Sequence, residues 1–231
     1  MVDDGKLQKR KKRPRGPRSA LRDEILNLPN ILTMGRVVII PLVIGCMAAS
    51  DDLVSGPLLA RRMAFWATAL FAAASITDFL DGWLARNLDL QSSFGRFLDP
   101  LADKLLVMAC LIELVALDRT PDWLVVLLLS REVAITGLRA LAAEEGFVLP
   151  SDRFGKWKTA LQMCGLIGLL LHFPAETDFL LFRGPVDYHR VGTVLLLVSM
   201  VFSLISAVSY MASFVRTTLV AHAQKVTPPA A

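Results

Sequence analysis

The sequence contains little cysteine and little histidine, with 3 residues of each among 231. Cys46, Cys110 and Cys164 stand alone inside apolar runs, and no CxxC or Cys/His spacing occurs. This excludes a zinc module and a disulfide scaffold, and it predicts that the cysteines are small buried hydrophobic residues. The histidines lie near the ends of apolar runs or between them, without metal-ligand spacing, and we assign them no role.

The sequence also has no internal repeat and no short apolar segment close to its start. A transporter built from inverted halves would show a repeat. A cleaved signal peptide would have an earlier and shorter apolar region than the first run here, about residues 31–49. We therefore expect neither of these classes.

Hydrophobic residues make up 54% of the chain, the mean hydropathy is +0.52, and charged residues are 20%. This is too apolar for an ordinary soluble domain. The net charge of +4 comes largely from residues 1–19, which are basic, contain Pro14 and Pro17 and show no apolar periodicity. We expect a disordered cytoplasmic arm that contacts anionic lipid rather than nucleic acid.

The rest of the chain predicts an all-α, polytopic membrane protein with six transmembrane helices. A spanning helix needs roughly 20 mostly apolar residues. The expected domain covers residues 20–216, begins with an amphipathic interfacial helix at 20–28, and is followed by a loose tail at 217–231. The six apolar runs cover about residues 31–49, 63–78, 97–117, 123–143, 158–173 and 191–214.

Six spans place both termini on one side of the membrane. That side also receives most of the basic residues outside the arm, and the opposite connections are richer in acids. The positive-inside rule assigns the basic side to the cytoplasm. The prediction is a multi-pass protein of the cell membrane whose termini are both cytoplasmic.

Four aspartates stand between the second and third runs, at this cytoplasmic edge. Asp78 and Asp81 are spaced i, i+3, and Asp99 and Asp103 are spaced i, i+4, so on helices each pair shares one face. Four carboxylates in one place need positive charge between them, and hard divalent cations take oxygen ligands and bind substrate phosphates. The spacing therefore favours metal-dependent phosphate chemistry at a bilayer surface over a solvated loop.

Together with the small residues between the pairs, the pattern D-x2-D-G-x2-A-R-x8-G-x3-D-x3-D over 78–103 resembles the signature of the CDP-alcohol phosphatidyltransferases. The resemblance implies six transmembrane helices, a homodimer, and two Mg²⁺ or Mn²⁺ ions per active site. It implies transfer of a phosphatidyl group from a CDP-linked lipid to an alcohol, with release of CMP. Membrane lipid surrounds such an enzyme, and no nucleic acid is expected.

The resemblance also implies a role for each motif residue. Asp78, Asp81 and Asp99 would be metal ligands, and Asp103 would be the catalytic base and lie close to a metal. The residues expected to line the CDP site are Gly82, Ala85, Arg86 and Gly95, with Thr33 as a further candidate that the sequence equally allows to be a helix cap.

Further segments bear on the acceptor alcohol. Residues 29–36 (PNILTMGR), 131–139 (REVAITGLR) and 155–163 (GKWKTALQM), with LDPLADK at 98–104, resemble the bacterial branch of the family that uses sn-glycerol 3-phosphate. The expected donor is CDP-diacylglycerol. A phosphorylated acceptor needs cations, and intramembrane charges normally face a bundle interior. The candidates for binding the acceptor phosphate are Arg131, Arg139, Lys156, Lys158 and Arg216.

Each of these bases has an alternative interpretation. Arg131 can pair with Glu132 or with a motif aspartate, and Lys156, Lys158 and Arg216 can be interface anchors. Inositol phosphate is the main alternative acceptor, since it also needs cations, and serine or another phosphatidylglycerol fits less well. A divalent-cation channel would need polar residues through the whole membrane, whereas the acids and most bases here gather on one side.

Overall fold

A computed structural model describes residues 28–51, 56–88, 93–145, 153–179 and 182–226. Within these ranges the side chains at 28–33, 78–88, 93–101, 103, 153–154, 175–179, 182–183 and 220–226 lie outside the description. The elements in chain order are α2 (Leu28–Ala48), α4 (Pro57–Leu88), α5 (Ser93–Ala116), α6 (Asp122–Glu144), α7 (Arg153–Leu171), β1 (Ala175–Phe179), β2 (Phe182–Val186) and α8 (Tyr188–Val226).

Local sequence explains where several helices begin and end. Pro57 opens α4 directly after Gly56, whose φ of 76° suits glycine. Asp187 precedes α8, and its Oδ1 accepts a hydrogen bond from the Arg190 N–H at 3.1 Å, which is N-cap geometry. α5 is followed by a positive φ at Asp118, a common way for a helix to terminate.

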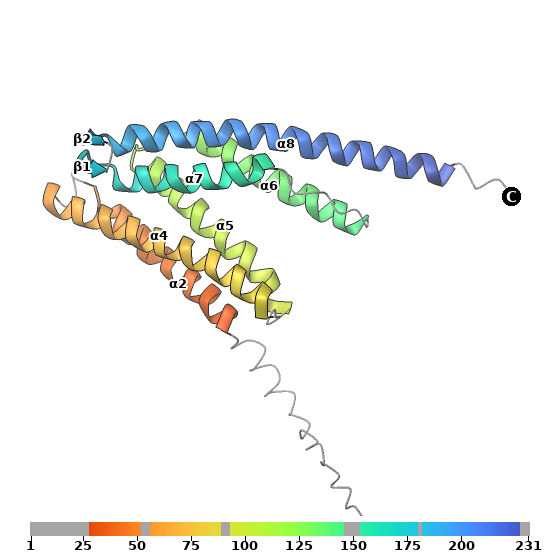
Figure 1. Cartoon of the computed structure of the whole chain (residues 1–231), viewed down its shortest axis with the longest axis horizontal. Helices are drawn as coiled ribbons and strands as arrows, with labels where there is room; N and C mark the ends of the chain where they lie inside the picture. The colour runs from red at the N-terminus through yellow and green to blue at the C-terminus, as the bar shows by residue number, and fades with distance from the viewer. Residues whose placement is uncertain (1–27, 52–55, 89–92, 146–152, 180–181, 227–231) are drawn as a thin grey trace, which may run out of the picture.

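The helices form one bundle in which α2 lies beside α4 and α7 runs along α8 (Figure 1). The α7–α8 contact is close because glycines face each other across it. A Cβ built on Gly192 would lie 2.6 Å from the Leu169 nitrogen, and one on Gly168 would lie 2.8 Å from the Gly192 Cα. Small residues let helix backbones approach in this way.

The main apolar core joins all six described helices, with Phe71 of α4, Leu111 of α5 and Leu166 of α7 fully buried within it. A second, smaller cluster joins Ile135 and Leu138 of α6 to Tyr210 of α8. Within the described side chains, many large apolar ones on outer helix faces are exposed, as expected for surfaces that contact lipid.

Each of the six described helices overlaps one of the six predicted apolar runs, but two predictions about the connections and tail were wrong. Residues 175–186, expected in a mixed polar loop, form an antiparallel hairpin in which Ala175 pairs with Val186 and Phe179 with Phe182. The expected loose tail at 217–231 is helical as far as Val226, because no Gly or Pro occurs between Gly192 and Pro228. The predicted arm at 1–19 and most of the predicted helix at 20–28 lie outside the described residues.

The described helices differ in length and apolarity. Among the described residues, Tyr188–Leu219 of α8 is long and apolar enough to cross a membrane, and Met34–Ala48 of α2 is apolar but shorter. α6 carries Arg131, Glu132 and Arg139 along its length, which lowers its hydropathy. All-α architecture with an apolar span is therefore established, apart from the small hairpin.

Candidate active site

The four motif aspartates belong to two helices that follow each other in the chain. Asp78 and Asp81 lie in α4, which continues to Leu88, and Asp99 and Asp103 lie in α5. The helical spacing that the sequence predicted for each pair is thus present in the backbone. The side chains of these aspartates, and of the predicted CDP-site residues Thr33, Gly82, Ala85, Arg86 and Gly95, lie outside the described residues.

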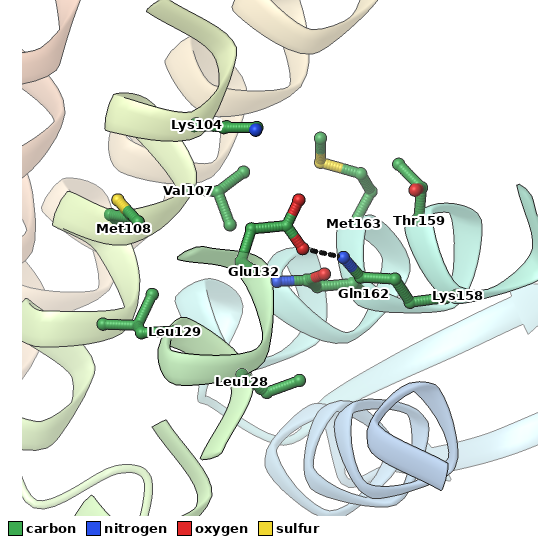
Figure 2. A pocket seen from close by; sticks show the side chains of 10 residues that line it. All are labelled: Lys104, Val107, Met108, Leu128, Leu129, Glu132, Lys158, Thr159, Gln162 and Met163. Atoms are coloured by element: carbon green, nitrogen blue, oxygen red, sulfur yellow. Dashed lines mark hydrogen bonds and ion pairs between the residues drawn. The ribbon is translucent and has the colours of Figure 1, made fainter. Parts of the chain in front are cut away.

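A pocket lies between α5, α6 and α7 (Figure 2). One of its lining residues is Lys104, which follows Asp103 in α5. Its polar wall consists of Lys104, Glu132, Lys158, Thr159 and Gln162. Its apolar wall consists of Val107, Met108, Leu128, Leu129 and Met163. The cavity is about 60 Å³, which is room for a few water molecules or one small hydroxylated group.

Glu132 is the centre of the polar wall. Its Oε2 accepts hydrogen bonds from the Lys158 ammonium and from Arg131 Nη1, the latter at 3.3 Å. Arg131 Nε also donates to the Ser203 carbonyl of α8 at 2.9 Å. The Glu132 carboxylate therefore connects α6 to α7 directly, through Lys158. It connects α6 to α8 indirectly, through Arg131. Removing one partner from this partly buried cluster would leave a charge uncompensated.

The fourth charged group, Lys104, is also attached to α6. Its Nζ donates to Thr136 Oγ1 at 2.5 Å, and that hydroxyl donates in turn to the Glu132 carbonyl at 2.7 Å. The net charge of this group is +2, because one acid, Glu132, faces three bases: Lys104, Arg131 and Lys158. A phosphate dianion beside these residues would neutralise the excess.

Arg139 lies further along α6 and contacts α8. Its Nη2 donates to the Tyr210 hydroxyl at 2.7 Å, and its guanidinium carbon lies 4.7 Å from the centre of the Tyr210 ring. Tyr210 is buried between Ile135 and Leu138, whereas Arg139 itself is exposed. Arg139 is thus held in place on a rigid ring and remains accessible to solvent.

The other predicted bases are less connected. Lys156 in the first turns of α7 and Arg216 near the end of α8 are both exposed, and the described contacts do not join either to the pocket. Arg36 of α2 is buried. The structure therefore brings together Arg131 and Lys158 among the five predicted phosphate binders.

Sequence reasoning missed several members of this site. It treated Glu132 only as one possible partner for Arg131, and it gave no role to Thr136, Gln162 or Tyr210. A signal was present, because Glu132 and Thr136 are spaced i, i+4 and so are Lys158 and Gln162. Of the alternatives for Arg131, the structure contains the pairing with Glu132.

The opposite end of the bundle has polar contacts of its own. Arg119, after α5, donates from Nη2 to the carbonyl and hydroxyl oxygens of Ser50 at 2.8 and 2.9 Å, joining two inter-helix connections. The Nδ1 atoms of His172 and His189, which the sequence left without a role, lie 3.3 Å apart. Among the described side chains, no group of three or more His, Cys, Asp or Glu residues could hold a metal; the motif aspartates are not among them.

Comparison with known proteins gives a match over nearly the whole bundle. The family model described as CDP-alcohol phosphatidyltransferase matches residues 26–220. A Bacillus subtilis protein named CDP-diacylglycerol--glycerol-3-phosphate 3-phosphatidyltransferase is 44% identical over 151 residues, covering 64% of this chain and 78% of the relative. A Rickettsia felis protein of the same name is 35% identical over 184 residues, covering 80% of this chain and 93% of the relative.

A third relative is named for a different activity. A rice protein named Cardiolipin synthase (CMP-forming) is 38% identical over 161 residues, covering 64% of this chain and 46% of that protein. Relatives with two different named activities thus each cover about two thirds of this chain.

Proposed function

The chain belongs to the CDP-alcohol phosphatidyltransferase family, and we propose that it transfers the phosphatidyl group of CDP-diacylglycerol to sn-glycerol 3-phosphate, giving phosphatidylglycerol phosphate and CMP. This reaction is a step of phospholipid biosynthesis. The choice of acceptor rests on the three basic residues gathered around Glu132, namely Lys104, Arg131 and Lys158. Lys104 directly follows Asp103 in α5. A serine or phosphatidylglycerol acceptor would not need this excess of positive charge.

Enzymes of this family generally depend on a divalent metal. The donor set offered by Asp78, Asp81, Asp99 and Asp103 is entirely carboxylate oxygen, which fits Mg²⁺ or Mn²⁺. We assign two ions to these residues. When bound, the metal polarises the diphosphate of the donor lipid and neutralises the charge on departing CMP.

The remaining chemistry falls to protein side chains. The acceptor hydroxyl oxygen forms a bond to the phosphorus of the phosphatidyl group, and the bond from that phosphorus to the CMP oxygen breaks. Asp103 accepts the proton that the hydroxyl loses, which a positioned carboxylate can do. Thr33, Gly82, Ala85, Arg86 and Gly95 form the CDP site, in which glycines and alanine leave room for the nucleotide.

The acceptor phosphate is held by bases from α6, α7 and α8. Arg139 supports this assignment best, because its guanidinium is fixed against Tyr210 yet exposed, and a planar fork suits phosphate oxygens. Arg131 and Lys158 add positive charge behind Glu132. Lys156 and Arg216 complete the proposed set as exposed cations.

The membrane arrangement belongs to the same proposal. We place all six helices across the cell membrane, with the active site and both termini cytoplasmic, because most of the basic residues outside the arm gather on that side. The arm at 1–19 attaches to anionic lipid, and the enzyme acts as a homodimer.

An acceptor panel tests the proposal. Purified protein in detergent with CDP-diacylglycerol and Mg²⁺ receives sn-glycerol 3-phosphate, inositol 1-phosphate or serine in separate reactions, and CMP release is measured. We expect CMP with sn-glycerol 3-phosphate. CMP with inositol 1-phosphate alone would transfer the assignment to that acceptor, and absence of CMP with every acceptor would contradict the enzyme assignment.

A further inference from the structure

Glu132 uses one of its two carboxylate oxygens for both of its basic neighbours. Oε2 accepts from Lys158 and from Arg131, and the described contacts include none to Oε1. Figure 2 shows the second oxygen pointing away from Lys158, on the side of the pocket where Lys104 and Met163 lie. A carboxylate oxygen is therefore presented to the interior of the pocket.

Glu132, Arg131 and Lys158 differ in how far their side chains are exposed, which indicates that Glu132 does more than neutralise the two bases. Arg131 and Lys158 are 9% and 8% exposed, whereas Glu132 is 28% exposed. The acid thus reaches further toward the opening than the bases it neutralises. The pocket presents a charged hydrogen-bond acceptor at this point, and a hydroxyl donor is the group that such an acceptor binds.

The surroundings fit a small polyol. Gln162 is 9% exposed and lines the same cavity with Thr159, so amide and hydroxyl groups stand close to the carboxylate. The cavity of about 60 Å³ accommodates the hydroxyl-bearing carbon of a small polyol. Lys104, on the wall contributed by α5, directly follows the proposed base Asp103.

We propose that Glu132 determines acceptor specificity by accepting a hydrogen bond from the non-reacting hydroxyl on the central carbon of sn-glycerol 3-phosphate. This inference rests on the proposed function, in which one terminal hydroxyl attacks and the phosphate occupies the other end. A contact at the central carbon fixes the distance between the two ends. It orients the attacking hydroxyl toward Asp103 while the phosphate contacts the bases.

The test compares two acceptors that differ only in this hydroxyl. 3-Hydroxypropyl phosphate has the same phosphate and a primary hydroxyl to react, but its central carbon has no hydroxyl. A hydrogen bond to a charged group contributes about 1.5–3 kcal/mol, so wild-type enzyme should prefer sn-glycerol 3-phosphate in kcat/KM by about 10- to 100-fold. Glu132→Gln keeps the shape but removes the charge, and the preference should fall roughly tenfold.

The fall should come from poorer use of sn-glycerol 3-phosphate, with 3-hydroxypropyl phosphate changed much less. Glu113→Gln, which alters a partly buried acid of α5 outside the pocket, is the matched control and should keep the wild-type preference. A structural role for Glu132 alone would lower kcat/KM for both acceptors by the same factor, and that result would overturn the inference.

The wild-type measurement is decisive without any variant. Equal kcat/KM for the two acceptors would show that the central hydroxyl is not bound, which overturns this inference and leaves the proposed function standing. No CMP release with either acceptor would instead overturn the proposed function, and this inference with it.

Discussion

Arg139 of α6 and Tyr210 of α8 hold each other across the bundle, with a 2.7 Å hydrogen bond from Nη2 to the phenol oxygen and the guanidinium carbon 4.7 Å from the ring centre. Tyr210 is 4% exposed, so its ring is a fixed support. An arginine that is already oriented loses less entropy when it binds a phosphate. The pair therefore joins the packing of α6 on α8 to the proposed recognition of the acceptor.

Replacing Arg139 should affect the acceptor and not the donor. We expect Arg139→Ala to raise the KM for sn-glycerol 3-phosphate by about 10- to 100-fold, the cost of one charge-assisted hydrogen bond, with the KM for CDP-diacylglycerol within about threefold of wild type. Steady-state CMP release gives both values. Arg190→Ala, at the hairpin end of α8, is the control and should behave as wild type. An unchanged acceptor KM in Arg139→Ala would remove Arg139 from the site.

Replacing Tyr210 by Phe isolates the hydrogen bond, because the ring and its stacking remain. The KM for sn-glycerol 3-phosphate should rise about fivefold, since a neutral hydrogen bond contributes about 1 kcal/mol, and kcat should stay near wild type. A matching fall in kcat and in thermal stability, with no change in KM, would show that Tyr210 only supports the fold.

The glycines between α7 and α8 give a matched pair of stability tests. Gly192→Ala would place a Cβ 2.6 Å from the Leu169 nitrogen, whereas Gly137→Ala of α6 would place one with nothing within 4 Å. We expect Gly192→Ala to lower the free energy of unfolding by about 1–3 kcal/mol through overpacking. Gly137→Ala should be neutral or slightly stabilising. Thermal unfolding in detergent would detect the difference, and equal melting temperatures would contradict the close α7–α8 contact.

Asp103→Asn tests the assignment of the catalytic base. An amide cannot accept the proton of the attacking hydroxyl, so kcat should fall by about 10²- to 10⁴-fold or more. Binding of CDP-diacylglycerol, measured by calorimetry in detergent, should persist, because Asp78, Asp81 and Asp99 remain as ligands. Asp118→Asn, at the opposite end of the bundle, should be fully active. Substantial turnover by Asp103→Asn would assign the proton transfer to another group.

Removing divalent metal should abolish turnover reversibly. Dialysis against EDTA should reduce CMP release to background, and either Mg²⁺ or Mn²⁺ should restore it, since both accept carboxylate oxygens. Ca²⁺ is the useful comparison, because its larger radius and looser geometry should support binding better than catalysis. Activity that survives EDTA would contradict a metal site at the four aspartates.

The helices were predictable because each apolar run is long and bounded by Pro, Gly or charged residues. The predicted second run at 63–78 was too short, since α4 begins at Pro57 and continues to Leu88. The hairpin was missed because Gly184 and Pro185 in β2 are poor strand formers, and only the pairing of β1 with β2 makes this segment a strand.

The contact partners of the basic residues could not be predicted from the sequence, for a different reason. The motif identifies the aspartates because their spacing is local. The partners of the bases are distant, since Arg131 contacts Ser203, Lys158 contacts Glu132 and Arg139 contacts Tyr210. These contacts depend on how α6, α7 and α8 cross, which the apolar pattern of each helix alone does not determine.

The central claim, transfer of the phosphatidyl group to sn-glycerol 3-phosphate, is tested most directly by measuring both products of a reaction with labelled acceptor. Enzyme, Mg²⁺, CDP-diacylglycerol and sn-glycerol 3-phosphate labelled in its phosphate are incubated, and label in extracted lipid is compared with CMP released. The proposed function predicts one labelled phosphatidylglycerol phosphate for each CMP, and label at background in Asp103→Asn. Release of CMP without label in lipid would mean that water, not sn-glycerol 3-phosphate, accepts the phosphatidyl group, and it would contradict the proposed reaction.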